Sequence, residues 1–131
     1  MSSVPVELRY TKDHEWVKVE GPNARIGITD FAQDQLTDVV YVSLPKKGQS
    51  VKQHDVVGEV ESIKSVSEIF SPVSGQVVEV NDKLNAEPGL INRSPYSDGW
   101  ICVVKLGNAS EIKDLLTHTQ YEALTQGGAG H

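Results

Sequence analysis

The alternation of apolar and polar residues in the first third of the chain predicts a β-hairpin. In residues 16–20 the valines fall on one face and the charged residues on the other, and residues 24–28 alternate in the same way. A two-residue period is that of a strand with one buried face. The Gly-Pro-Asn sequence at 21–23 lies between the two runs and supplies the turn.

A short helix and further strands are expected after this hairpin. Asp30 is the expected N-cap of the helix, with Gln33 three residues later, and Phe31 and Leu36 are expected to face inward. A long ordered loop is expected at 81–97. A Pro-Gly pair at 88–89 and a Ser-Pro pair at 94–95 are the turn signals in this segment. Runs of β-branched and aromatic residues predict strands at 39–44, 56–63, 69–80 and 100–106.

The C-terminal region changes from strand to helix patterns. Ser110 is the expected cap of one helix, and Thr119 with Glu122 forms the expected capping box of a second, which ends at Leu124. The glycine-rich residues 126–131 are expected to form a flexible tail.

These elements predict a mainly β fold. Many short strands in two layers indicate a flattened β-sandwich or barrel-like arrangement, with a short helix after the first hairpin and short C-terminal helices. The length of 131 residues fits a single domain spanning 1–131, with its core at about 8–125.

Composition narrows the possible chemistry. The 12 Lys and Arg against 18 Asp and Glu give a net charge of −6, which argues against nucleic acid as a partner, because backbone phosphates require a basic face. The apolar runs are too short to span a membrane. Cys102 is the only cysteine, so an internal disulfide is excluded, as in proteins of reducing compartments. Any dithiol that this chain uses must therefore be attached to it.

The first residues of the chain bear on its location in the cell. Residues 1–5 lack the basic and apolar plan of a secretory signal and the arginine-rich pattern of a transit peptide. We therefore expect a cytoplasmic location in a bacterium. The alternative is a mitochondrial matrix, with a transit peptide already removed.

Lys64 stands out from the other lysines by its setting. It lies between two β runs among serines at 62, 65 and 67, which suits a hairpin turn with side chains projecting into solvent. Between residues 55 and 82 it is the only base among six acids. One interpretation is an ordinary surface lysine paired with Glu61 or Glu68. The other is an amine presented to a modifying enzyme.

The second interpretation is supported by a resemblance. The segment before Lys64 and the turn-strand segment 70–77 after it look like the lysine hairpin of biotinyl and lipoyl carrier domains. Biotin carriers have methionine on both sides of the lysine, and lipoyl domains of 2-oxo acid dehydrogenases have an Asp-Lys-Ala core; neither is present here. Within the class, the chain resembles the glycine cleavage H-protein family in seven ordered stretches, which are 14–17, 27–33, 38–42, 60–65, 71–75, 88–92 and 95–100.

The resemblance implies a non-catalytic carrier with a lipoyl-domain hybrid fold. Lipoic acid would be joined by an amide bond to Lys64 by a lipoate ligase or a lipoyl or octanoyl transferase, which would recognise a hairpin containing Glu61, Ser62 and Ser65. The other implied partners are a pyridoxal-phosphate glycine decarboxylase, a tetrahydrofolate-dependent aminomethyltransferase and a dihydrolipoyl dehydrogenase. A monomer is expected.

The resemblance also implies a cleft that shelters the aminomethyl cargo from water. The carried amine is cationic, so carboxylates at the cleft are expected to attract it. The family pattern assigns this position to Glu15, Glu68 and Asp13. Gln35 stands where some relatives have histidine.

Other functions remain open from the residues alone. A second carrier hypothesis is a lipoyl donor for 2-oxo acid dehydrogenases. A small catalytic domain with His14 and Glu15 as acid and base is another, although no nucleophile motif accompanies them. A β-sandwich adaptor that is never modified is the third. No metal site is expected, because the histidines lack the spacing of metal ligands.

Overall fold

The computed structural model describes residues 4–129 and contains two antiparallel β-sheets around one core. The larger sheet has the strand order β1-β2-β3-β9-β8-β5 and the smaller has the order β4-β6-β7. The strands of the larger sheet are β1 (Arg9–Tyr10), β2 (Glu15–Glu20), β3 (Asn23–Ile28), β5 (Ser50–Val51), β8 (Gly75–Val80) and β9 (Cys102–Leu106). Those of the smaller sheet are β4 (Val39–Ser43), β6 (Val56–Ser62) and β7 (Val66–Phe70). The predicted mainly β, two-layer fold is confirmed.

The first hairpin forms as its alternation predicts. Strands β2 and β3 pair with Val17 opposite Ile26, and both side chains are buried. Trp16 lies opposite Gly27, and a Cβ at Gly27 would come within 2.6 Å of the indole ring. The glycine therefore allows a fully buried tryptophan to lie flat across the neighbouring strand.

Both sheets contribute to the core, which explains why the strands are rich in valine and isoleucine. Buried side chains from β3, β9 and β8 meet those from β4, β6 and β7, and burial of each such side chain stabilises the fold by about 1.5–3 kcal/mol. Cys102 is fully buried within β9, and burial raises the pKa of its thiol to about 12, so the thiol is inert.

Helix α1 (Asp30–Leu36) follows the hairpin as predicted, but its cap is one residue earlier. Thr29, not Asp30, is the N-cap: its backbone is extended, and its hydroxyl oxygen accepts the Ala32 N–H at 3.2 Å. Asp30 is the first helical residue and accepts the side-chain amide of Gln33 at 2.6 Å. The N-cap is thus Thr29, the residue that directly follows the end of β3.

The expected loop at 81–97 contains two single helical turns, α2 (Lys83–Ala86) and α3 (Leu90–Arg93). The segment begins at Asn81, whose amide donates to the backbone oxygens of Asp98 and Trp100, each at 2.8 Å. Buried leucine and isoleucine side chains anchor the two turns. Four-residue helices carry too little periodicity to be predicted from a pattern.

The C-terminal helices begin at other caps than those predicted. Asn108, not Ser110, caps the 3-10 helix η1 (Ala109–Asp114). The capping box of α4 (His118–Ala129) is formed by Thr117 and Gln120, not by Thr119 and Glu122. Each cap is displaced by two residues, because another polar residue nearby competes for the same position.

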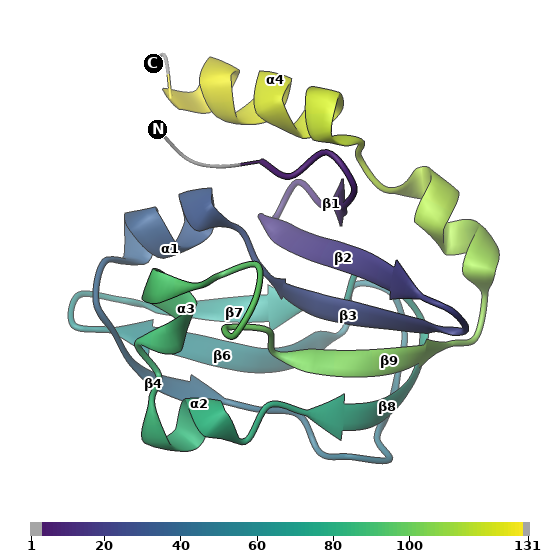
Figure 1. Ribbon diagram of the computed structural model, residues 1–131, viewed down its shortest axis with the longest axis horizontal. Helices are drawn as coiled ribbons and strands as arrows, with labels where there is room; N and C mark the ends of the chain where they lie inside the picture. Colours follow the sequence, from purple (N-terminus) through teal and green to yellow (C-terminus); the bar gives the residue numbers. More distant parts are fainter. Residues whose placement is uncertain (1–3, 130–131) are drawn as a thin grey trace.

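Helix α4 continues to Ala129, past the predicted end at Leu124. The backbone at 126–129 is therefore helical, where a flexible tail was expected, and residues 130–131 lie outside the described part of the chain. Figure 1 shows α4 along one side of the molecule, next to the N-terminal segment and β1. The Tyr121 ring stacks on Tyr10 of β1 at a centroid distance of 4.7 Å. In residues 4–129, the helices fall short of the length and apolar content that a bilayer crossing requires.

Candidate functional site

The turn between β6 and β7 presents Lys64 to solvent. The two strands pair antiparallel up to Glu61 opposite Val66, and the residues between them form the turn. Lys64 is exposed at its apex, and in Figure 1 the turn protrudes at the left edge of the molecule, below α1. The structure thus confirms the predicted position of Lys64 in a hairpin turn.

Ser62 fixes the shape of this turn. Its side chain is buried, and its hydroxyl oxygen accepts the backbone N–H groups of Lys64 at 3.3 Å and of Ser65 at 3.1 Å. The same hydroxyl donates to the Ser65 carbonyl at 3.2 Å. Within the described residues, Lys64 forms no ion pair, so the pairing with Glu61 or Glu68 is not observed. A stiff turn with a free amine results.

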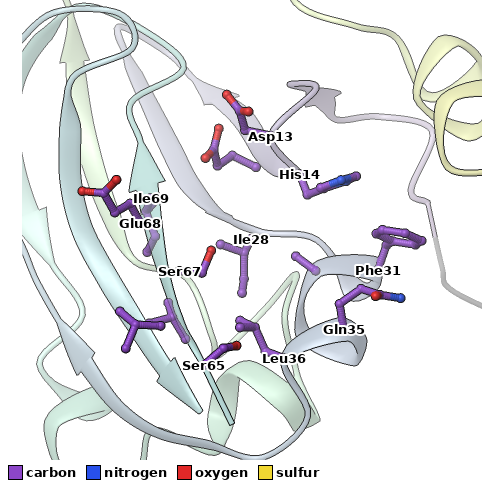
Figure 2. A pocket seen from close by; sticks show the side chains of 14 residues that line it. Asp13, His14, Ile28, Phe31, Gln35, Leu36, Ser65, Ser67, Glu68 and Ile69 are labelled. Carbon is purple, nitrogen blue, oxygen red and sulfur yellow. The ribbon is translucent and has the colours of Figure 1, made fainter. Parts of the chain in front are cut away.

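A cleft of about 420 Å³ opens beside the hairpin. Its walls come from three places in the sequence: the turn into β2, helix α1, and strand β7 with the end of the hairpin (Figure 2). These walls contribute Asp13, His14, Glu15, Phe31, Gln35, Leu36, Ser65, Ser67 and Glu68. The predicted acids and the lysine hairpin therefore border one cavity.

Glu15 is the buried acid of this cleft. It is only 2% exposed, and its two carboxylate oxygens accept the Thr11 hydroxyl at 2.7 Å and the Phe70 N–H at 3.0 Å. Burial raises the pKa of Glu15 to about 7, against the opposing effect of these two hydrogen bonds. A carboxyl with this pKa changes charge near neutrality, so it can meet a cation or accept a proton.

Asp13 and Glu68 both border the cleft but differ from Glu15 in exposure. Asp13 is exposed in the turn into β2. Glu68 pairs across the sheet with Glu59, whereas Ser67 pairs with the buried Val60. In Figure 2 the Ser67 side chain accordingly points into the cavity, and the Glu68 carboxylate points to the other side of the strand. Contact of Glu68 with cargo stays a prediction.

His14 forms part of the cleft wall in an uncommon backbone conformation. Its φ is 69°, in the left-handed region that a residue other than glycine seldom adopts. The ring packs on Phe31 at 4.8 Å, and Nδ1 lies 2.7 Å from the Tyr121 hydroxyl. Burial lowers the pKa of His14. The imidazole is therefore neutral near pH 7 and packed into the wall.

Two residues that contact the cleft wall without lining the cavity were not singled out from the sequence. Tyr121 and Thr29 hydrogen-bond to each other at 2.7 Å although they lie far apart in the chain. No local pattern signals such a contact. Gln35 lies on the exposed side of α1 at the cleft. Among the described residues, three or more metal-ligating side chains do not gather anywhere.

Two sheets around one core, with a free lysine at the end of a protruding hairpin, define a carrier domain that presents an amine for modification. The sequence model of the family described as Glycine cleavage H-protein matches residues 8–127, and the chain belongs to this family. Its members are the lipoyl carriers of the glycine cleavage system. The chain is accordingly a carrier component and not an enzyme.

Individual relatives agree over nearly the whole chain. The glycine cleavage system H protein of Geobacillus kaustophilus is 55% identical over 126 residues, covering 96% of this chain and 99% of the relative. That of Bacillus subtilis is 52% identical over 124 residues, covering 95% and 98%. A crystal structure of the Mycobacterium marinum H protein superposes with a TM-score of 0.87 at 37% identity, covering 94% and 99%.

Proposed function

We propose that lipoic acid is attached by an amide bond to Lys64 and that the cleft beside the hairpin shelters the aminomethyl cargo of this arm. The observation that carries the proposal is the exposed Lys64 amine on a stiff turn, next to a cleft of about 420 Å³. When attached, lipoic acid supplies a dithiol–disulfide couple that carries the one-carbon unit and two reducing equivalents.

The residues of the hairpin suit the attachment step. An acylating enzyme must reach the amine without unfolding a strand, and the turn projects it into solvent. Ser62 and Ser65 hold the turn by hydrogen bonds, so little conformational entropy is lost when an enzyme binds it. Glu61 pairs with Val66, the first residue of β7 after the turn, and adds negative charge for a basic partner surface.

The cleft suits a short apolar arm with a cationic end. Ile28, Phe31 and Leu36 supply apolar wall, which can cover methylene groups and exclude water. Glu15 supplies a carboxyl that is desolvated and already hydrogen-bonded. In such a setting the attraction between a carboxylate and an ammonium group is stronger than in water. Asp13 adds a second acid at the same side of the cleft.

The partners proposed for this chain follow from the same chemistry. They are the pyridoxal-phosphate glycine decarboxylase, the tetrahydrofolate-dependent aminomethyltransferase, the dihydrolipoyl dehydrogenase and the enzyme that attaches lipoic acid. Membership in the family supports partners within the glycine cleavage system. The relatives described above are bacterial, which supports a bacterial cytoplasm and gives no support to the mitochondrial alternative. We propose that the carrier acts as a monomer.

Intact-mass measurement tests the attachment. Protein produced in cells supplied with lipoate should gain one lipoyl increment, and Lys64→Arg should gain none. Lys47→Arg is the matched control, because Lys47 is another exposed lysine in a turn; it should be modified like the wild type. Glycine–bicarbonate exchange with the decarboxylase should then require the modified protein. A lipoyl increment that persists in Lys64→Arg would overturn the assignment.

A further inference from the structure

The hydroxyl of Tyr121 connects two adjacent segments that carry lining residues of the cleft. Tyr121 lies on α4 and is fully buried. Its oxygen is 2.7 Å from Nδ1 of His14 and 2.7 Å from Oγ1 of Thr29. His14 belongs to the turn into β2, whereas Thr29 caps α1, so a single hydroxyl joins two neighbouring segments that carry lining residues of the cleft.

The Thr29 contact bears on the position of α1. The same hydroxyl oxygen that meets Tyr121 also accepts the Ala32 N–H and so caps the helix. Helix α1 carries Phe31 and Leu36, which line the cleft. A shift at the cap therefore moves the apolar wall.

The His14 contact bears on the position of the turn into β2. The residue holds a left-handed conformation, φ 69°, and its carbonyl accepts the Thr29 N–H at 3.0 Å. Its ring packs on Phe31 at 4.8 Å and meets Tyr121 edge-on at 5.6 Å. The next residue is Glu15. Holding the His14 ring thus also holds the start of the strand that bears the buried acid.

Burial favours the neutral forms of both partners in this bridge. Burial raises the pKa of the Tyr121 hydroxyl above its ordinary value, and burial lowers the pKa of His14. Asp13 is the charged neighbour that opposes this lowering. A neutral phenol can donate one hydrogen bond and accept another, which satisfies both neighbours at once.

We propose that Tyr121 is a positioning residue that holds the turn into β2 against helix α1, so that His14 and Phe31 close this side of the cleft, and thereby limits water access to the carried aminomethyl group. This inference rests on the sheltering function proposed above. It makes the C-terminal helix a part of the site, although α4 contributes no lining residue of its own to the cleft. Cargo that is not sheltered reacts with one water: its carbon–sulfur and carbon–nitrogen bonds both break, the water oxygen becomes the carbonyl oxygen of formaldehyde, and the free thiol and ammonium are released.

The test compares two buried tyrosines that stack on each other. Tyr121→Phe removes the bridging hydroxyl and keeps the ring. Tyr10→Phe is the matched control: Tyr10 is equally buried, but its hydroxyl donates to the Pro5 carbonyl, away from the cleft. Each lipoylated protein is loaded by glycine and the decarboxylase, the decarboxylase is removed, and formaldehyde release is timed. Contacts between the His14 and Phe31 rings are measured by NMR on the unmodified proteins.

We expect Tyr121→Phe to release formaldehyde about tenfold faster than the wild type, because a buried hydrogen bond changes an opening equilibrium by roughly that factor. Its ring contact between His14 and Phe31 should weaken. Tyr10→Phe should match the wild type in both measurements. Thr29→Ser keeps the bridging hydroxyl and should also match it.

Two results would overturn the inference. In the first, Tyr121→Phe protects its cargo as well as the wild type. In the second, Tyr10→Phe loses protection equally, which would indicate general destabilisation. A failure of the sheltering function itself has another signature: the wild type would then release formaldehyde as fast as the loaded carrier unfolded in urea, and all variants would be equal.

Discussion

The buried carboxyl of Glu15 makes the stability of the carrier depend on pH in a way that can be calculated. Burial raises its pKa from 4.5 to about 7, and one pKa unit corresponds to about 1.4 kcal/mol. Ionising Glu15 in the folded protein therefore costs about 3 kcal/mol more than in the unfolded chain. Because the folded pKa is the higher one, the stabilising contribution is complete below about pH 4.5 and is lost as the pH rises through about 7.

Glu15→Gln isolates this effect. Glutamine has the same shape, and its carbonyl oxygen can still accept the Phe70 N–H that the carboxylate accepts at 3.0 Å, but it does not ionise. The difference in unfolding free energy between variant and wild type should shift in favour of the variant by about 3 kcal/mol between about pH 4 and about pH 8. For a chain of this length, that corresponds to about 10 °C in Tm.

Urea unfolding of the unmodified proteins, followed by tryptophan fluorescence at a series of pH values, measures the difference. Glu68→Gln is the control, because that side chain is exposed and its removal relieves no buried charge. It should follow the wild type at all pH values. If Glu15→Gln and the wild type lose stability in parallel over the whole range, the reasoning about a desolvated carboxyl in the cleft is refuted.

Two further predictions concern attachment and shelter. Ser62→Ala removes the hydroxyl that holds the Lys64 turn, so the rate of lipoylation per unit enzyme should fall about fivefold, since a hydrogen bond contributes roughly 1 kcal/mol; an unchanged kcat/KM for the lipoylating enzyme would show that the turn needs no such support. Glu15→Ala removes the buried acid of the cleft, so formaldehyde release from the loaded carrier should rise about tenfold if the carboxylate–ammonium contact contributes about 1.4 kcal/mol; an unchanged rate would remove Glu15 from the shelter.

The exposed hairpin position of Lys64, the proposed attachment site, could be predicted from the sequence because it is local. Two strands, the turn between them and the exposed amine all lie within residues 56–70, where alternation and turn residues are directly visible. The family resemblance also assigned Glu15, Glu68 and Asp13 to a cleft, and all three border the cavity beside the hairpin. The direction of Glu68, however, depends on which residue of β6 it faces, and a shift of one residue exchanges the two faces of a strand. The sequence of a single strand does not determine this pairing register.

The helix caps show a different limit. Caps were predicted for three helices, α1, η1 and α4. In each case the sequence offered a polar residue suited to capping, and a neighbouring polar residue occupies the N-cap position in the structure. Thr29 replaces Asp30 because strand β3 fixes where the extended backbone ends. Side-chain preference alone leaves several candidates within two residues, and tertiary contacts decide among them.

The proposed shelter depends on contacts between the two ends of the chain, which is why the part of Tyr121 in it was not predicted. His14 and Tyr121 are 107 positions apart and meet at 2.7 Å. A left-handed residue other than glycine costs roughly 1–3 kcal/mol, so the turn at His14 keeps this conformation only while surrounding contacts outweigh that cost. The Thr29 N–H and the Tyr121 hydroxyl supply such contacts. The proposed modification of Lys64 therefore depends only on a hairpin, whereas the proposed protection of the cargo depends on docking of α4 on β1, since the docked helix brings the Tyr121 hydroxyl to His14.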